Sequence, residues 1–499
     1  MKKRKFLTLA LTALMAMQCV LTSCSSKKDD GTVTLKWYIG GSEQADLKEV
    51  NDKLNEYTRE KIGAEIEIVM LDWSAYDQKM NMLISTKSDF DLCWTSPQTN
   101  NYYTNIDKNA FLPLNDLIKQ YAPKTYAGVP EDIWEAARVN GEIYGIINYQ
   151  VMATAYGFAV QREIADKAGF DWANVNNYKD IEPVLKYVKE NYPTYVPIGI
   201  SKASNPFTKA LPMFGLEAVG GTSEIGAVYT KGSDYKVVNQ FETPEFMDYI
   251  KLMREWYQKG YIKQDAPTTS DDTTDRVAGK IAVLFPEYFL NDTTVSDYFP
   301  DQPYGTTGKT YYLKRLSMPY LSNDRALATM TAISSTSKHP EKAMEFIELV
   351  NTDEEVYNLL CWGIEGKHWN KTDYISPEGY HITVDQVENS RYKPNTPWVF
   401  GNNVNLWLGK INASAEFWES ENEKADKSPL LGFSYDASNT TSETANCASV
   451  CDEYLNALVC GSVDIDTVYP QFIDKLKVAG ADKIVAEKQK QIDEWLKTK

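Results

Sequence analysis

Residues 32–42 read TVTLKWYIGGS, and this short stretch decides the fold. Its first eight residues alternate between polar and apolar side chains, which predicts a strand. A glycine pair then turns the chain, and Ser42 is the predicted N-cap of a helix with Glu43 in its first turn. The folded body is therefore expected to open with a strand that leads through a glycine turn into a helix.

The following residues continue this alternation of strand and helix. Apolar residues recur at spacings of three and four from Leu47 to Tyr57, which predicts an amphipathic helix that ends near Gly63. A strand, a helix and a third strand are predicted next, over 65–71, 75–85 and 90–94. Strands separated by helices predict a parallel sheet with right-handed crossovers, so the fold class is α/β.

The rest of the chain keeps the α/β pattern and closes with helices. Strands are predicted over 143–146, 158–160, 195–200, 279–285 and 326–333, with helices over 161–168, 181–191, 246–259 and 341–350 between them. The C-terminus is predicted to be helical over 444–459, 466–478 and 481–496. A chain of 499 residues exceeds the size at which one core stops growing, so two lobes are expected.

The N-terminus has the features of a lipoprotein signal peptide. Four cations, at positions 2–5, precede an apolar run over 6–21, which is too short for a membrane-spanning helix. The run ends in Leu21-Thr22-Ser23-Cys24, the pattern that lipoprotein signal peptidase cleaves. We therefore predict a signal over 1–23, a lipid anchor on Cys24 and a polar tether over 24–31; an ordinary signal peptide with a chance cysteine is the alternative.

Composition limits the expected cellular location and binding partners of the protein. The net charge is −17, and no long basic run is present, so binding to nucleic acid is not expected. Beyond the signal no apolar run reaches the roughly 18 residues that cross a bilayer. We expect an exported, monomeric body held by lipid on the extracytoplasmic face of a bacterial membrane.

The cysteines do not form a disulfide framework. Besides Cys19 in the signal and Cys24, five remain, an odd and sparse set. Two of them, Cys447 and Cys451, have the i, i+4 spacing of a metal pair, but the three histidines show no ligand spacing. Buried or free thiols are therefore expected, with no metal and no cofactor.

The carboxyl ends of the first three strands form the first candidate ligand site. Ligands bind outside these ends in open α/β sheets, and the loops there carry aromatic and hydroxyl side chains. Tyr149, at the predicted boundary of the lobes, joins this set. Packing of Trp37 and Trp94 against helices is the competing interpretation. The predicted ligand-binding residues of this first site are Trp37, Tyr38, Trp73, Thr95, Ser96 and Tyr149.

Two aromatic loops in the C-terminal half form the second candidate site. Residues 362–369 read WGIEGKHW and residues 397–407 read PWVFGNNVNLW. Carboxylate oxygens accept hydrogen bonds from sugar hydroxyls and indole faces stack on sugar C–H surfaces. Alternatively, Glu365 pairs with Lys367 or His368 and its loop is a structural turn. The predicted ligand-binding residues here are Trp362, Glu365, His368, Trp398 and Asn402.

Short motifs in order along the chain resemble a known family. The cleavage pattern at Cys24, the segments 89–92 and 140–145, Gly279-Lys280-Ile281-Ala282 and Pro340-Glu341-Lys342-Ala343 resemble ABC-importer extracellular solute-binding proteins of family 1. Residues 363–368 and 430–433 resemble its LipO-like lipoprotein subfamily, whose C-terminal region is a domain of unknown function. The resemblance implies a two-lobed periplasmic-binding-protein-like fold with a hinge and discontinuous lobes: 32–148 with 315–350, and 149–314 with 351–499.

The resemblance and the aromatic loops favour a binding function over catalysis. We expect closure of the two lobes on a small solute, an oligosaccharide above all, for delivery to ABC permease subunits. A peptide-binding protein of the same fold is an alternative. A glycosidase or lyase is another, for which Glu365 and Asp72 could supply the two carboxylates, although no catalytic motif is visible. An all-helical surface glycan receptor conflicts with the predicted strands.

Overall fold

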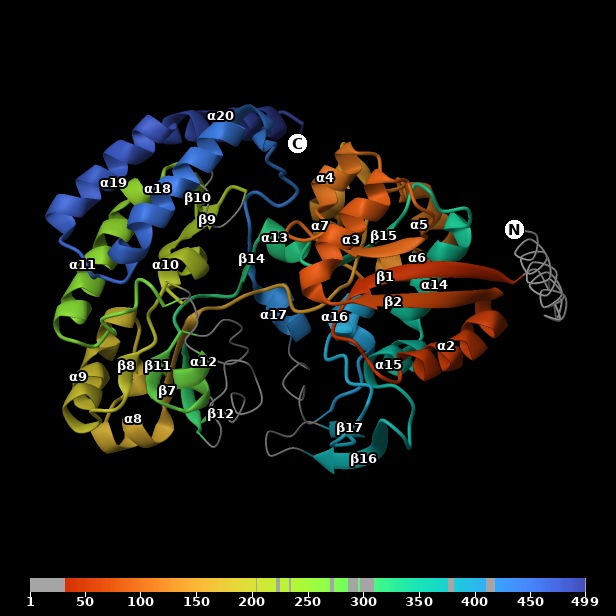
Figure 1. The fold of residues 1–499 in the computed structure, drawn as a ribbon, viewed down its shortest axis with the longest axis horizontal. Helices are drawn as coiled ribbons and strands as arrows, with labels where there is room; N and C mark the ends of the chain where they lie inside the picture. The colour runs from red at the N-terminus through yellow and green to blue at the C-terminus, as the bar shows by residue number, and fades with distance from the viewer. Residues whose placement is uncertain are drawn as a thin grey trace, which may run out of the picture.

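Two sheets lie side by side, one in each lobe (Figure 1). The computed structural model describes residues 32–498 apart from 203, 221–224, 233–234, 270–272, 286–294, 297–308, 376–380 and 410–417. The predicted signal, Cys24 and the tether therefore lie outside the described residues. The mixed α/β architecture confirms the predicted fold class.

The first sheet has the strand order β2-β1-β3-β15-β6. Strands β1, β2 and β3 are parallel, as predicted, whereas β15 runs antiparallel to both of its neighbours. The sheet is therefore mixed, because a strand from residue 330 onward enters between β3 and β6. The strand bounds are β1 Val33–Gly40, β2 Ala64–Leu71, β3 Leu92–Thr95, β6 Ile146–Ile147 and β15 Met330–Ile333.

The predicted start of the first helix is wrong by several residues. Helix α2 begins at Leu47 after an Asp46 N-cap, not after Ser42. Tertiary contacts hold the intervening loop instead, because Gln44 accepts a hydrogen bond from the backbone N–H of Lys393 at 2.6 Å. The helix ends as predicted, at Gly63, whose φ of 65° is the left-handed conformation that favours glycine at a helix end.

Helices surround the first sheet. Helix α3 directly follows β2, so its first residue, Trp73, lies beside the end of that strand. The helices of this lobe are α2 Leu47–Ile62, α3 Trp73–Ser85, α4 Tyr102–Asp107, α5 Asn115–Tyr121, α6 Pro123–Ala127, α7 Glu131–Ala137, α13 Asn323–Ala326, α14 Pro340–Thr352, α15 Glu354–Trp362 and α16 Pro397–Phe400.

The second sheet has the order β12-β13-β7-β11-β8. Three long C-terminal helices cover this lobe together with α11 (Figure 1), and they match the predicted ranges within three residues. The strands are β7 Gly157–Gln161, β8 Val196–Ile198, β11 Ile281–Leu284, β12 Val295–Ser296 and β13 Tyr311–Arg315, and the main helices are α8 Arg162–Ala168, α9 Glu182–Asn191, α11 Pro244–Gln258, α18 Thr441–Val459, α19 Ile465–Ala479 and α20 Ala481–Leu496.

Buried apolar side chains form two large clusters, one in each lobe. The predicted boundary after residue 350 is revised by the first of these clusters. Val356, Leu360, Val384 and Phe400 belong to it, although the prediction placed everything after residue 350 in the second lobe. Helix α15 packs beside α14 and α2, so the apolar face of this segment is covered by the first sheet's helices.

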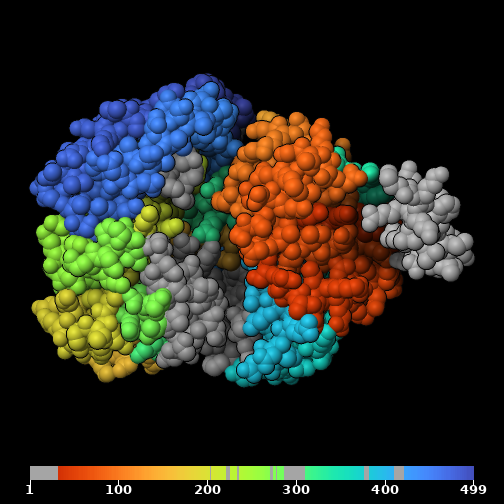
Figure 2. All heavy atoms as spheres, viewed as in Figure 1, coloured from red at the N-terminus to blue at the C-terminus, as the bar shows by residue number. Residues whose placement is uncertain are grey.

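Three segments cross between the lobes. The first starts after β6, the second contains β14 (Tyr320–Leu321), and the third contains β18 (Asp426–Lys427), which pairs with β14 in parallel. Helix α17 (Trp418–Lys424) lies centrally beside them (Figure 1). The surface is hollowed where the two lobes meet (Figure 2).

In the part of the chain that the structure describes, no helix combines the length and the apolar character that crossing a bilayer requires.

Candidate functional site

One edge of the first sheet faces the crossing segments. The parallel strands β1, β2 and β3 end at this edge, and β15 begins there because Met330 pairs with both Thr95 and Ile147. The chain leaves this edge for the second lobe directly after β6. Side chains at this edge are therefore placed toward the space between the lobes.

Three tryptophans meet at this edge and form what we call the tryptophan cluster: Trp73, Trp94 and Trp398. The rings of Trp73 and Trp398 are stacked, with centroids 5.5 Å apart and planes at 17°. The Trp94 ring meets both edge-on, at 5.0 Å and 5.8 Å. Trp94 is only 4% exposed, whereas Trp73 and Trp398 are half-buried. The cluster thus places two half-buried indoles on a buried third.

Local structure fixes Trp73 in the cluster. Asp72 caps α3 by accepting a hydrogen bond from the Ser74 N–H at 2.9 Å, which sets the first helical residue over the strand ends. A Cβ atom on Gly40 would lie 2.2 Å from the Trp73 ring. The glycine at the end of β1 therefore lets the indole lie directly on the backbone.

Hydrogen bonds from the sheet edge hold the backbone of Trp398. Its carbonyl oxygen accepts from Thr329 Oγ1 at 2.7 Å and from Asn148 Nδ2 at 3.0 Å. The Trp94 indole N–H donates to the same Thr329 hydroxyl at 2.7 Å. The loop that carries Trp398, about 300 residues after Trp94 in the sequence, is thus joined to Trp94 through one hydroxyl group.

The cluster has the chemistry of a carbohydrate-stacking surface. Indole faces are flat, apolar and electron-rich, so they pack against the C–H faces of sugar rings. The Trp398 carbonyl is hydrogen-bonded and Trp94 beneath the pair is buried, so little ordering is required when a ligand binds. Trp73 and Trp398 were predicted site residues, and the structure brings them together.

Two other predicted residues are core residues. Trp37 is 1% exposed and packs edge-on against Phe346 and Phe400, at 5.3 Å and 6.1 Å. Tyr149 is also buried, at the start of the first crossing segment. Their predicted roles in ligand contact are corrected, because side chains from distant parts of the chain cover both rings. Tyr38 is half-buried and packs edge-on against Phe90 at 5.9 Å.

The predicted hydroxyl and amide donors hold the backbone of their own loops. Thr95 Oγ1 donates to the Asn100 carbonyl at 2.6 Å, and Ser96 Oγ accepts from the Thr99 N–H at 3.0 Å. Asn402 Oδ1 accepts from the Val404 N–H at 2.9 Å. All three residues are buried, so the structure assigns them to loop geometry and not to ligand contact.

The loop over residues 362–369 is packed on the first lobe. Trp362 is buried and donates its indole N–H to the Trp407 carbonyl at 3.2 Å. His368 is buried, accepts the Ile364 N–H at 2.9 Å on Nδ1 and lies 3.3 Å from Asp46 through Nε2. Both were predicted ligand residues, and both are structural. Gly363 permits the packing, because a Cβ there would lie 2.5 Å from the His368 ring.

Glu365 is the exposed member of this loop. Neither alternative partner pairs with it: Lys367 binds Asp46 at 2.7 Å and also Glu49, and His368 faces Asp46. Among the described residues its carboxylate has no ion pair and no hydrogen bond. The structural-turn interpretation is therefore wrong about the partners, while contact of Glu365 with a ligand stays a prediction.

Asp46, and not Glu365, pairs with the basic side chains around this loop. The Lys367 ammonium lowers the pKa of the Asp46 carboxyl, burial opposes this effect, and His368 and Arg391 lower the pKa further. The carboxylate joins the loop over 362–369 and Arg391 to the start of α2. It therefore stabilises the packing of the segment that the prediction had assigned to the other lobe.

Asp72, one of the two carboxylates considered for a glycosidase, does not have the electrostatics of a general acid. A general acid needs a raised pKa. The pKa of Asp72 is lowered, because the Ser74 hydroxyl and the Ser74 N–H both donate to its carboxylate. Asp72 is a helix cap, and nothing in its surroundings prepares it to donate a proton.

A buried carboxyl between the crossing segments was not predicted from the sequence. Glu217, in β9 (Leu216–Ala218) of the second lobe, accepts hydrogen bonds from the Tyr320 hydroxyl at 2.5 Å and from Ser428 Oγ at 2.6 Å. Burial raises its pKa to about 7, although both donors lower it. One side chain thus joins the second lobe to two crossing segments, a position that no local pattern in the sequence marks.

Helix α17 binds the other side of the crossing segments. Asn422 Oδ1 accepts the N–H groups of Met152 and Ala153, both at 2.9 Å, and its Nδ2 donates to the Gln150 carbonyl at 2.8 Å. Glu421 pairs with Arg315 at 2.7 Å, with both side chains largely buried. Adjacent residues of one helix therefore hold the first crossing segment and the end of β13, after which the second crossing segment begins.

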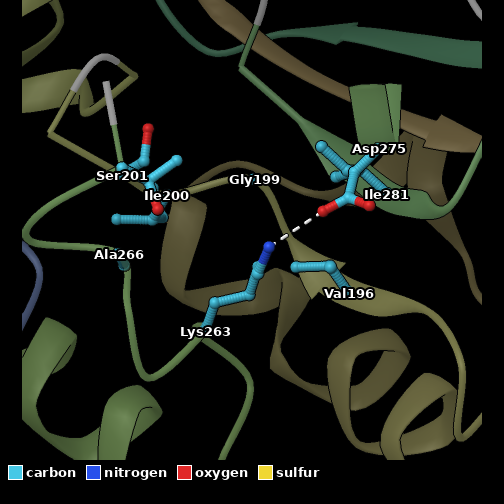
Figure 3. Close-up of a pocket in the computed structure, with 9 residues that line it drawn as sticks. Val196, Gly199, Ile200, Ser201, Lys263, Ala266, Asp275 and Ile281 are labelled. Atoms are coloured by element: carbon cyan, nitrogen blue, oxygen red, sulfur yellow. Dashed lines mark hydrogen bonds and ion pairs between the residues drawn. The ribbon is translucent and has the colours of Figure 1, made fainter. Parts of the chain in front are cut away.

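Two pockets of the second lobe lie away from the tryptophan cluster. One has a volume of about 20 Å³, room for about one water molecule, and Lys263 pairs with Asp275 at its wall at 2.9 Å (Figure 3). The other, of about 380 Å³, lies beside α8 and α9. Neither includes a predicted site residue.

The described residues contain no group of histidine, cysteine and carboxylate side chains suited to a metal ion. The five cysteines are buried and free, which confirms the prediction of buried or free thiols. Burial raises the pKa of Cys451 to about 12, so it is a poor thiolate ligand.

Comparisons with known proteins agree with this architecture. The model of the family described as bacterial extracellular solute-binding protein matches residues 40–357, and a domain of unknown function, DUF3502, matches residues 429–497. A carbohydrate ABC transporter substrate-binding protein of Streptococcus pneumoniae is 31% identical over the whole of both chains. Lipoprotein LipO of Bacillus subtilis is 23% identical over 53% of this chain and 51% of its own length.

Solved structures of one relative are also similar to this chain. The N-glycan transport solute binding protein NgtS of Streptococcus pneumoniae matches with a TM-score of 0.80 and 28% identity, covering 93% of this chain and 99% of that one. Its complexes with Man1GlcNAc and Man5GlcNAc match with TM-scores of 0.70 and 0.66, at 30% and 29% identity, and cover 93% and 94% of this chain and at least 99% of theirs. With its two lobes, its crossing segments and a family match over more than half its length, the chain belongs to the bacterial extracellular solute-binding proteins.

Proposed function

We propose that this protein binds an oligosaccharide of the N-glycan class between its lobes and delivers it to an ABC importer. The observation that carries the proposal is the tryptophan cluster, with two half-buried indoles at the edge that faces the other lobe. The relatives named for carbohydrate and N-glycan transport support the ligand class. The membership of the chain in a family of solute-binding proteins supports binding without turnover.

The comparison with NgtS supports a closing motion. The chain matches the NgtS structure described without a glycan with a TM-score of 0.80, and the two glycan complexes with 0.70 and 0.66. This difference supports a lobe arrangement nearer to that of NgtS without a glycan. Closure would bring the second lobe toward the tryptophan cluster and exclude water from the sugar.

Calorimetry on the folded body, residues 32–499, tests the ligand and the site together. Man5GlcNAc is the probe. Trp73→Ala and Trp398→Ala should each weaken binding by on the order of 10- to 100-fold, the range for a buried aromatic anchor. Trp172→Ala is the matched control, because this half-buried indole also stacks on an aromatic ring, Tyr312, but in the second lobe at 4.4 Å.

Each result bears on a separate part of the proposal. Absence of binding to any oligosaccharide, or tight binding of peptides alone, would overturn the ligand class. Oligosaccharide binding that survives both cluster substitutions would keep the ligand class and reject the site.

We further propose that the mature protein is a monomer anchored by lipid on Cys24. The relative named Lipoprotein LipO supports the anchor. Cys24→Ala should release the protein from the membrane fraction without lowering the melting temperature of the body. Lipid labelling that persists in this variant would refute the anchor, and light scattering after gel filtration measures the oligomeric state.

A further inference from the structure

We propose that Thr329 is a positioning residue that sets the Trp398 indole for ligand stacking. This inference rests on the proposed function, because it assigns a role within the same site. Thr329 precedes β15 and is 2% exposed, so it does not itself touch a ligand. Its hydroxyl lies between two members of the tryptophan cluster.

The hydroxyl is used as donor and as acceptor. Oγ1 accepts from the Trp94 indole N–H and donates to the Trp398 carbonyl, both at 2.7 Å. Asn148 Nδ2 lies 3.4 Å from the same oxygen and donates to the Trp398 and Val399 carbonyls at 3.0 Å and 3.1 Å. A hydroxyl offers one hydrogen and two lone pairs, and all three face a partner here.

Side chains from other elements hold the Trp398 loop, and Thr329 is the one among them that also bonds to the Trp94 indole. The loop comes from α16, four residues long, and Gly401 follows it directly. Thr329 is linked to the strand edge by its own carbonyl, which accepts the Asn148 N–H at 3.1 Å. The sheet edge, Trp94 and the Trp398 backbone are thus joined at one buried side chain, and the stacking angle of Trp398 on Trp73 depends on it.

Substitution of Thr329 by valine isolates this role. Valine keeps the shape of threonine but cannot bond to the Trp94 N–H or the Trp398 carbonyl. Thr329→Val should weaken Man5GlcNAc binding by about 5- to 20-fold, the scale of one or two misplaced hydrogen-bonded groups. Thr329→Ser, which restores the hydroxyl, should recover most of the affinity.

Near-UV circular dichroism of the ligand-free protein measures the positioning itself. Stacked indoles couple their transitions, so a rotated Trp398 ring should change the tryptophan signal. The change should be smaller when Thr329→Val is made in a Trp398→Phe background, where only the Trp94 indole can respond. Thr58→Val serves as the control for loss of a buried hydroxyl in the same lobe, since Thr58 is buried in α2 and bonds only weakly, to Asn55 at 3.5 Å.

The outcomes separate this inference from the proposed function. A changed spectrum with weaker binding, both restored by serine, supports the inference. An unchanged spectrum overturns it, and so does a changed spectrum with unchanged affinity. If the unsubstituted protein binds no oligosaccharide, the proposed function fails, while the spectra still report whether Thr329 positions Trp398.

Discussion

At the scale of the residue, burial separates side chains of the same type. Trp37 lies within β1 and Trp73 follows β2, yet Trp37 is buried whereas Trp73 is only half-buried. The buried asparagines and hydroxyls hold backbone, while the half-buried indoles are available for a ligand. The chemistry of a residue type therefore becomes a role only when its surroundings are known.

Glu217 gives a prediction for stability against pH. Its folded pKa of about 7 lies above the ordinary glutamate value, so the unfolded chain loses this proton at lower pH than the folded protein. The contribution of Glu217 to the free energy of unfolding is therefore greatest in acid, and it is lost as the pH rises through about 7. Glu217→Gln should be more stable than the unsubstituted protein at pH 8, by on the order of 3 kcal/mol, and similar at pH 4.

Denaturant unfolding at the two pH values checks this expectation. Glu60→Gln, at an exposed position of α2, is the control and should show no such difference. A stability gain for Glu217→Gln that is the same at both pH values would count against the shifted carboxyl. The other titratable groups near Glu217 are Tyr320, Asp324 and, beyond Tyr320, Asp426.

Glu365 gives a prediction in which stability and affinity separate. Because its carboxylate is exposed and without a partner among the described residues, Glu365→Ala should leave the melting temperature unchanged. If it accepts a hydrogen bond from a sugar hydroxyl, affinity should fall by on the order of 1.5–3 kcal/mol. Calorimetry beside thermal melts measures both, and unchanged affinity removes Glu365 from the site.

At the scale of the element, α17 organises the crossing segments. Glu421 and Asn422 are adjacent and bind different segments, so the helix fixes the spacing between them. The loop that carries Trp398 is organised in the same way, by asparagines that satisfy its backbone. Short elements in this protein are held by side chains from longer ones, because they have too few internal bonds to hold themselves.

Asn422→Ala should destabilise the protein by about 2 kcal/mol. The substitution leaves the buried N–H groups of Met152 and Ala153 without their acceptor. Chemical denaturation measures the loss, and Asn191→Ala, at an exposed helix end, is the control, where little change is expected. Equal stability of the two variants would show that α17 does not hold the first crossing segment.

At the scale of the whole molecule, two cores and three crossing segments allow one lobe to move against the other. A ligand that contacts both lobes has greater affinity for the closed form and shifts the population toward it. The direction of the shift is measurable without knowledge of the individual contacts.

Small-angle scattering should show a smaller radius of gyration in saturating Man5GlcNAc than in buffer. Trp73→Ala at the same glycan concentration should remain near the ligand-free value, because its binding is weakened. A radius that does not change although calorimetry shows the site to be full would contradict closure.

Local patterns in the sequence were enough to predict the main strands and helices of both lobes. The predicted C-terminal helices and the parallel strands β1 to β3 agree with the structure, because hydrophobic periodicity is a local property of the chain. The order of family motifs likewise predicted the family. The start of α2 was missed, because a contact from Lys393, far along the chain, holds the loop before it.

Which of these residues are buried and which stay partly exposed depends on contacts between distant parts of the chain. Trp37 is covered by Phe346 and Phe400, whereas Trp73 is met by Trp398 and keeps part of its ring open. The revised boundary after residue 350 and the burial of Glu217 have the same origin. Each depends on side chains that folding brings together from distant positions in the chain. The local spacing of residues does not predict such contacts.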